Sequence, residues 1–268
     1  MTGSLQRRLL LGALAAGAGS VAAGAVRRHH PGGSSRWQRT NYRGRQVELA
    51  GGPGVATGLA SALAVAGSPG ALVATVMAAG LGAYDDLAGH THARGLRGHA
   101  RALRNGVVTS GMVKMVGLTA AAVAAAPSRP RRPGGVALDV VLIAGTANLV
   151  NLLDLRPGRA AKVVVGLALP LTAARGSAGD VAASAVGVGL ALLPADLAEK
   201  QMLGDSGANA LGAALGWALA AQLRAAVRLS AAAAIVGLTV VSERVSFTEL
   251  IERQPMLAAF DRWGRRET

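Results

Sequence analysis

The sequence contains no cysteine, few aromatic residues and few charged residues. Without cysteine, the chain forms neither disulfides nor a thiolate metal site. Aromatic residues make up 3% of the 268 positions, so a water-soluble core would consist almost wholly of Ala, Val and Leu. Charged residues make up 16%, below the roughly 25% of typical soluble domains. These shortages disfavour a soluble globular protein.

Hydrophobic residues are abundant, at 51% of the chain, and the mean hydropathy is +0.38. Glycine and alanine recur in the apolar runs, and such small residues let membrane helices pack closely. We therefore expect an all-α fold, a polytopic membrane bundle of about nine transmembrane helices. The expected spans are residues 9–26, 54–67, 71–84, 106–126, 136–153, 163–174, 181–195, 208–223 and 229–241.

The first apolar run, residues 9–26, follows Arg7 and Arg8 and ends in small residues. This pattern is shared by a signal peptide and by a retained first span. We expect a retained span because many apolar runs follow it. Residues 1–241 then form a transmembrane helical domain, and 242–268 form a cytoplasmic amphipathic tail whose helix breaks at Pro255.

The formal net charge is +14, and the basic residues lie in short loops between apolar runs. This placement fits contact with lipid headgroups or phosphates, and no nucleic-acid binding is expected. If spans alternate, one side holds 19 Lys and Arg and the other holds 8, with Lys114 inside a span. The richer side holds the loops 27–51, 85–104, 154–162 and 196–207 and the tail.

The positive-inside rule places that richer side in the cytoplasm. The loop 127–135, with three arginines on the opposite side, is the exception. We expect a multi-pass protein of the cytoplasmic membrane with its active site facing the cytoplasm.

Four of the 14 acidic residues lie at span ends on the predicted cytoplasmic side, and these are Asp85, Asp86, Asp154 and Asp205. A carboxylate at that depth costs a few kcal/mol unless it faces a polar cavity or a partner. Four of them suggest an oxygen-ligand site for a hard divalent cation, magnesium (Mg2+) where phosphates supply other ligands.

Each of these acids also has a structural interpretation. Asp85 and Asp86 fit the start of a solvated loop, and Asp205, followed by Ser and Gly, fits a helix N-cap. Asp139 and Asp180 begin spans on the opposite side, where the helix dipole favours an acid, and we interpret them as structural.

Each polar residue inside the spans also has more than one interpretation when it is considered alone. Asn148, Asn151 and Asp154 recur every three residues and lie close to one helical face. Membrane Asn residues also serve as polar contacts between helices. Lys114 fits either a phosphate contact or a side chain that extends to the interface.

Taken together, three motifs resemble the polyprenyl-phosphate N-acetylhexosamine-1-phosphate transferase superfamily, which includes the phospho-N-acetylmuramoyl-pentapeptide translocase of peptidoglycan synthesis. The family pattern is an Asp-Asp pair, then Asn-x-x-Asn-x-x-Asp-Gly, then Gly-Asp-x-Gly-Ser before a Leu-Gly helix. The chain reads Asp85-Asp86, then Asn148-Leu-Val-Asn151-Leu-Leu-Asp154, then Gly204-Asp205-Ser206-Gly207-Ala208 before Leu211-Gly212. The resemblance covers most of the chain, from the first loop to the eighth span.

The resemblance implies transfer of a sugar 1-phosphate from a nucleotide sugar, usually a UDP-sugar, to a membrane polyprenyl phosphate. The products are a polyprenyl diphosphate-linked sugar and a nucleoside monophosphate, in cell-wall or surface glycan synthesis. It implies Mg2+ held by Asp205 and Asp154, and catalytic roles for Asp85, Asp86 and Asp154 at the phosphates. The substrate-binding residues that we expect are Asn148, Asn151, Lys114 and Arg156.

The chain departs from the family pattern after Asp154. The family continues Gly-x-Asp-Gly, whereas this chain has Leu155-Arg156-Pro157-Gly158, so that a second acid is replaced by Pro157. The His-rich loop of the peptidoglycan member is also missing, and a muramoyl-pentapeptide substrate is not expected. The main alternative is a non-catalytic membrane scaffold with the same fold. A secondary transporter ranks third, because its acids usually lie near the midplane.

The last predictions concern two basic loops and the oligomeric state. His90, His92 and His99 follow the Asp pair in a loop that we interpret as solvated or in contact with donor phosphates, rather than as a transition-metal site. The segment 36–54, with Trp37 and Tyr42, is interpreted as an interfacial anchor or a phosphate-contacting loop. Small-residue helices also allow a homodimer.

Overall fold

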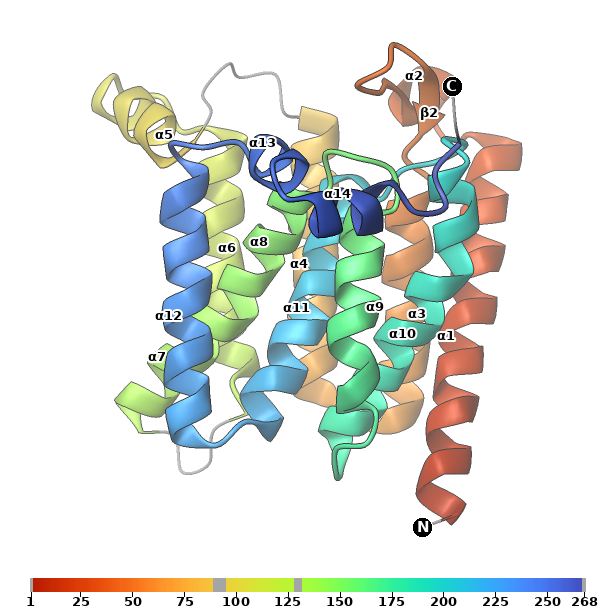
Figure 1. Ribbon diagram of the computed structural model, residues 1–268, viewed down its shortest axis with the longest axis vertical. Coiled ribbons are helices and arrows are strands. Elements are labelled where there is room, and N and C mark those ends of the chain that lie inside the picture. Colours follow the sequence, from red (N-terminus) through yellow and green to blue (C-terminus); the bar gives the residue numbers. More distant parts are fainter. Residues whose placement is uncertain (1, 89–94, 128–131, 267–268) are drawn as a thin grey trace.

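The computed structural model describes residues 2–88, 95–127 and 132–266, which form a helical bundle (Figure 1). Helices hold 78% of the chain, in agreement with the all-α prediction. The bundle consists of α1 (Thr2–His29), α3 (Gly51–Ala66), α4 (Pro69–Ala88), α6 (Ser110–Ala125), α7 (Pro133–Val140), the π-helix η1 (Val141–Gly145), α8 (Thr146–Leu153), α9 (Arg159–Leu171), α10 (Ser177–Leu197), α11 (Gly204–Gln222) and α12 (Ala225–Ser242).

Smaller elements lie at one end of this bundle (Figure 1). They are α2 (Ser34–Trp37), the antiparallel hairpin of β1 (Gln38–Thr40) and β2 (Gln46–Glu48), α5 (Gly95–Arg104), α13 (Phe247–Glu252) and α14 (Pro255–Arg262). We call this end, where α4, α8 and α10 finish and α9 and α11 begin, the upper end. The sequence did not indicate the hairpin, which occupies part of the segment interpreted as an anchor or a phosphate-contacting loop.

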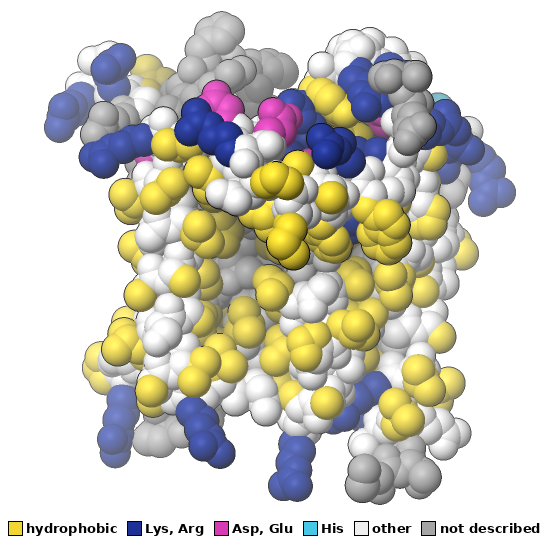
Figure 2. All heavy atoms as spheres, viewed as in Figure 1, with side chains coloured by type: hydrophobic (Ala, Val, Ile, Leu, Met, Phe, Trp, Pro, Cys, Tyr) yellow, Lys and Arg dark blue, Asp and Glu magenta, His cyan; other side chains and the backbone are white. Residues whose placement is uncertain are grey.

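Five helices are long and apolar enough to cross a membrane, namely α1, α4, the continuous segment Pro133–Leu153, α10 and α12. The helices α3 and α6 are apolar but shorter, and nine spans are not confirmed. Hydrophobic side chains cover the middle of the molecule, while Lys and Arg gather at its two ends (Figure 2). This distribution indicates a membrane-embedded protein.

Helix α11 runs through the middle of the bundle and is buried along most of its length. Small residues make this possible, because they let neighbouring backbones approach. A Cβ atom at Gly216 would lie 2.8 Å from the Cα atom of Ile143 in η1, too close for any side chain. Backbone contacts at glycine therefore help to set the position of α11, together with buried side chains such as Leu211 and Leu215.

Acidic residues at the lower end are paired with arginine. Asp180 accepts a 2.9 Å hydrogen bond from Arg7 and lies 3.7 Å from Arg8. Asp139 is fully buried and binds Arg228. Both acids thus join helices, as expected for structural residues. Asp180 lies in the first turn of α10 as predicted, but Asp139 lies beyond the first turn of α7, so that Arg228 stabilises it rather than the helix dipole.

The C-terminal tail packs on the upper end through a buried ion pair. Arg159, at the start of α9, donates to both carboxylate oxygens of Asp261 at 2.8 and 2.9 Å. Their exposed fractions are 3% and 5%. Lys162 donates to the carbonyls of Phe260, Asp261 and Trp263, which end α14. The tail helix is interrupted before Pro255, as predicted.

The ionisation of Asp261 is favoured by its partners. Burial raises its pKa, but the hydrogen bond and charge of Arg159 and the charge of Arg265 outweigh burial and hold the pKa below its ordinary value. Asp261 is therefore a carboxylate at neutral pH and provides a full charge to the ion pair.

We expect Asp261→Ala to release the tail, because breaking a buried ion pair costs about 3–5 kcal/mol. Trypsin digestion of the protein in detergent should then cleave after Arg253 and Arg262 markedly faster than in the parent. Glu252→Ala, an exposed change in the same tail, should leave the rate unchanged. Equal cleavage of the Asp261 variant and the parent would contradict this role.

Candidate functional site

The first and third acidic motifs meet where α4 passes the start of α11. A Cβ atom at Gly82 would lie 2.5 Å from the carbonyl carbon of Asp205 and 2.6 Å from the Cα atom of Ser206. The Ser206 hydroxyl donates to the Ala79 carbonyl at 3.0 Å. The absence of a side chain at Gly82 thus allows the backbones of α4 and α11 to touch.

Asp86 binds the amino terminus of α11. Its carboxylate accepts hydrogen bonds from the amides of Asp205 at 3.1 Å and Ser206 at 3.0 Å. These amides lack partners within their own helix and carry the positive end of its dipole. Asp86 therefore caps α11 from a neighbouring helix. Asp205 lies in the first turn of α11 rather than at its N-cap, which is Leu203.

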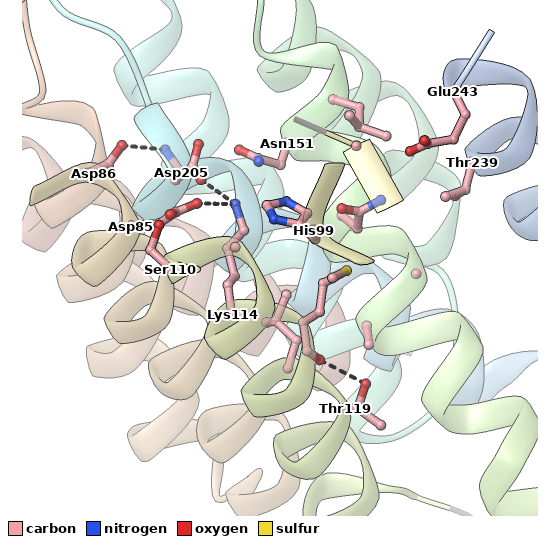
Figure 3. A pocket seen from close by; sticks show the side chains of 18 residues that line it. Asp85, Asp86, His99, Ser110, Lys114, Thr119, Asn151, Asp205, Thr239 and Glu243 are labelled. Carbon is pink, nitrogen blue, oxygen red and sulfur yellow. Dashed lines mark hydrogen bonds and ion pairs between the residues drawn. The ribbon is translucent and has the colours of Figure 1, made fainter. Parts of the chain in front are cut away.

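Lys114 lies between the carboxylates of Asp85 and Asp205 (Figure 3). Its ammonium group donates to Asp85 Oδ2 at 2.6 Å and also to Asp205 Oδ2. The residue is buried, with 9% of its surface exposed. The lysine thus supplies a fixed positive charge between α4, α6 and α11.

Asp154 follows α8 and lacks such a partner. Its Oδ2 atom is buried and has no hydrogen-bond partner among the described residues. Burial raises the pKa of Asp154 well above its ordinary range, and the charges of Asp196, Asp205 and Asp86 raise it further. Burial and the neighbouring acids therefore disfavour the ionised form of Asp154.

A cavity of ≈ 710 Å³, which we call the inner cavity, opens beside Lys114. Its polar wall holds six of the predicted site residues, and its deeper wall is partly apolar and includes Met115, Leu118 and Ala144. The π-helix η1 forms part of the wall, and π-helical bulges within α-helices occur frequently at functional sites. The predicted site residues on the wall are Asp85, Asp86, Lys114, Asn148, Asn151 and Asp205.

A second cavity of ≈ 350 Å³, which we call the hairpin cavity, lies beneath the β1–β2 hairpin. It is lined by Arg39 and Tyr42 from the hairpin and by Asp154 and Arg156 after α8. The guanidinium of Arg156 stacks over the Tyr42 ring at 3.9 Å from its centroid. Asp86 lines both cavities, so the predicted site residues are distributed around two adjoining spaces.

Sequence reasoning missed Asp196 and Glu199 in the hairpin cavity, and it included Arg39 only within the segment 36–54. Glu199 is buried and accepts hydrogen bonds from Asn41 and Arg43, which fixes the hairpin loop. Asp196 follows the predicted span 181–195 on the acid-bearing side, so the criterion that selected Asp85, Asp154 and Asp205 would have selected it too.

Of the three loop histidines, His90 and His92 lie outside the described residues. His99 lines the inner cavity, and its Nδ1 atom lies 2.7 Å from the Thr109 hydroxyl. Its structural position is thus at the cavity edge beside α6.

A magnesium site at these acids would have few protein ligands. Within residues 2–88, 95–127 and 132–266, no three His, Asp or Glu side chains are grouped as metal ligands. Asp85 and Asp205 both bind Lys114, whereas the Oδ2 atom of Asp154 is buried and unpaired. This arrangement fits Mg2+, which is usually bound by one or two carboxylates with phosphates and water supplying the rest.

No family model matches the chain, and no curated protein matches its sequence.

We expect Gly82→Ala to destabilise the site, because the new Cβ atom would meet the backbone of α11 and overpacking costs about 1–3 kcal/mol. Gly80→Ala is the matched control, since nothing lies within 4 Å of a Cβ atom there. That change should be neutral or stabilise the helix by about 0.5–1 kcal/mol. Thermal unfolding in detergent compares the two, and equal melting temperatures would refute the close contact.

Proposed function

We propose that the protein transfers a sugar 1-phosphate from a nucleotide diphosphate sugar to a membrane polyprenyl phosphate. The observation that carries the proposal is the meeting of two cavities at Asp86, one between apolar helices and one under a basic hairpin. A reaction between a lipid and a soluble nucleotide requires two such sites that share a charged boundary. The resemblance of the three acidic motifs supports the same reaction.

The inner cavity suits the lipid acceptor. Its partly apolar depth matches an isoprenoid chain, and its Lys114 ammonium offers the charge that attracts a phosphate. A phosphate monoester has a second pKa of about 6, so that it is largely deprotonated at neutral pH. The acceptor therefore needs positioning more than deprotonation.

The geometry divides the Asp-Asp pair between two tasks. Both oxygens of Asp86 accept α11 amides, whereas Asp85 faces the inner cavity and orients Lys114. On this proposal Asp85 and Lys114 position the acceptor phosphate, and Asp86 holds α11 in place. Asn148 and Asn151, on the same wall, donate hydrogen bonds to phosphate or sugar oxygens.

The hairpin cavity suits the nucleotide donor. Arg39 and Arg156 present guanidinium groups that match phosphate oxygens, and Tyr42 presents an aromatic face. The acceptor oxygen attacks the phosphorus that bears the sugar, the bond from that phosphorus to the bridging oxygen breaks, and the nucleoside monophosphate leaves. On this proposal a magnesium ion beside Asp154 would neutralise the diphosphate, while Asp205 orients Lys114.

The proposed orientation follows from the loop charges. The upper end carries the loops that hold most of the Lys and Arg residues, which places it in the cytoplasm under the positive-inside rule. The soluble donor would reach the hairpin cavity from that side, while the lipid would enter within the bilayer. We therefore propose a multi-pass protein of the cytoplasmic membrane.

The first test measures release of uridine monophosphate by purified protein in detergent with undecaprenyl phosphate, Mg2+ and a panel of UDP-sugars. We expect release from at least one donor, loss of release with chelator, and a fall of about 100-fold or more for Asp205→Asn. Glu249→Gln, an exposed change in the tail, is the control. Undiminished turnover by Asp205→Asn would remove Asp205 from the mechanism, and no release from any donor would favour the non-catalytic scaffold.

A second test separates the charge of Lys114 from its structural role. Lys114→Gln should abolish turnover and lower the melting temperature, because Asp85 and Asp205 lose their shared cation. The double change Lys114→Gln with Asp85→Asn should recover stability but not activity. Recovery of turnover in the double variant would show that Lys114 acts only on the fold.

A further inference from the structure

Asp154 and Asp196 lie together in the hairpin cavity, away from the Lys114 ion pairs. Asp196 belongs to the last turn of α10, and Asp154 follows the end of α8. Two helices that are separate in sequence thus place two acids in one small space.

Each of these carboxylates has an oxygen without a partner. Asp196 is 3% exposed and accepts a hydrogen bond from the Gly158 amide. The Oδ2 atoms of Asp196 and Asp154 are both buried and have no hydrogen-bond partner in the part of the chain that the structure describes. An unpaired buried polar group costs about 1–3 kcal/mol, and more when it is charged. Such a pair of acids is stabilised by a proton or by a cation between them.

Three basic side chains near the two acids bond other groups. Arg39 donates to the main-chain oxygen of Asp86 at 2.6 Å, and Lys162 donates to three carbonyls of the tail. Arg265 donates to the Asp261 carboxylate at 2.5 Å and to the Pro157 carbonyl at 3.0 Å. Their positive charges reduce the electrostatic repulsion between the Asp154 and Asp196 carboxylates, but their N–H groups do not donate to the unpaired Oδ2 atoms.

We propose that Asp154 and Asp196 together bind a divalent cation of the magnesium class through their free Oδ2 atoms. Hard cations favour carboxylate oxygens, and a site with two carboxylates leaves positions for water and for a diphosphate. This ligand set replaces the pair Asp154 and Asp205 that the sequence predicts, because Asp205 Oδ2 already binds Lys114. The inference rests on the proposed function only for the identity of the diphosphate.

The test measures binding of Mn2+ alone to the full-length protein in detergent by electron paramagnetic resonance. Asp196→Asn keeps an acceptor for the Gly158 amide but loses the charge, and we expect Mn2+ to bind about tenfold more weakly or worse. Asp205→Asn should bind Mn2+ like the parent, and so should Glu249→Gln. Parent-like binding by Asp196→Asn, a loss confined to Asp205→Asn, or no binding by the parent would each overturn the proposal.

A second measurement needs no variant and covers the case in which Asp196→Asn does not fold. Fe2+ bound to the parent protein, with ascorbate and peroxide, cleaves the backbone next to its ligands. We expect fragments that end near residues 154–158 and near residue 196. Cleavage only near residues 85 and 205 would overturn the proposal.

The two proposals fail separately. If Mn2+ binding requires Asp196 but no UDP-sugar is turned over, the cation site stands and the transferase does not. If turnover requires Mg2+ and Asp205 while Asp196→Asn reacts at the parental rate, the transferase stands and this ligand set does not.

Discussion

The upper end of the bundle depends on the binding of the Asp86 carboxylate to the first amides of α11. This bond fixes α4 against α11, since the amides carry the positive end of the helix dipole. Consecutive residues on a helix point about 100° apart, so that Asp85 takes a different direction and reaches Lys114. One acid of the pair thus holds the scaffold, and the other orients the only cation that is bonded to both Asp85 and Asp205 in the described chain.

Asp154 and Asp196 each have one carboxylate oxygen without a hydrogen-bond partner in the described chain. Five aspartates line the two cavities, and Lys114 binds two of them. A lysine on a helix is a permanent charge, suited to the phosphate of a lipid that stays in the bilayer. A magnesium ion is exchangeable and can arrive with a soluble diphosphate. Lys114 lines the inner cavity, whereas Asp154 and Asp196 line the hairpin cavity. On our proposals, the lysine therefore serves the lipid phosphate and the metal ion serves the soluble diphosphate.

The sequence predicted the helices well, because long runs of Ala, Leu, Val and Gly are a local signal. It also predicted that three acidic motifs gather at one end. It did not predict which atoms pair, since Asp86 and Ser206 are 120 residues apart and their contact depends on the packing of α4 on α11. The hairpin was missed because only three residues on each strand form it. Asp196 was missed because no motif surrounds it, although its position at a span end was visible.

The loop after α8 shows why a missing acid is weak grounds for inferring a lost function. In sequence, Pro157 stands where the family pattern has a carboxylate, which argues for inactivity. In the structure, the Gly158 amide binds Asp196 from α10, and Arg159 binds Asp261 from the tail. The loop is thus held by two distant acids, and Asp196 brings a carboxylate back beside Asp154. On our proposal, Asp196 takes the place of the acid that the family pattern has in this loop, and it comes from the end of a helix rather than from the loop itself.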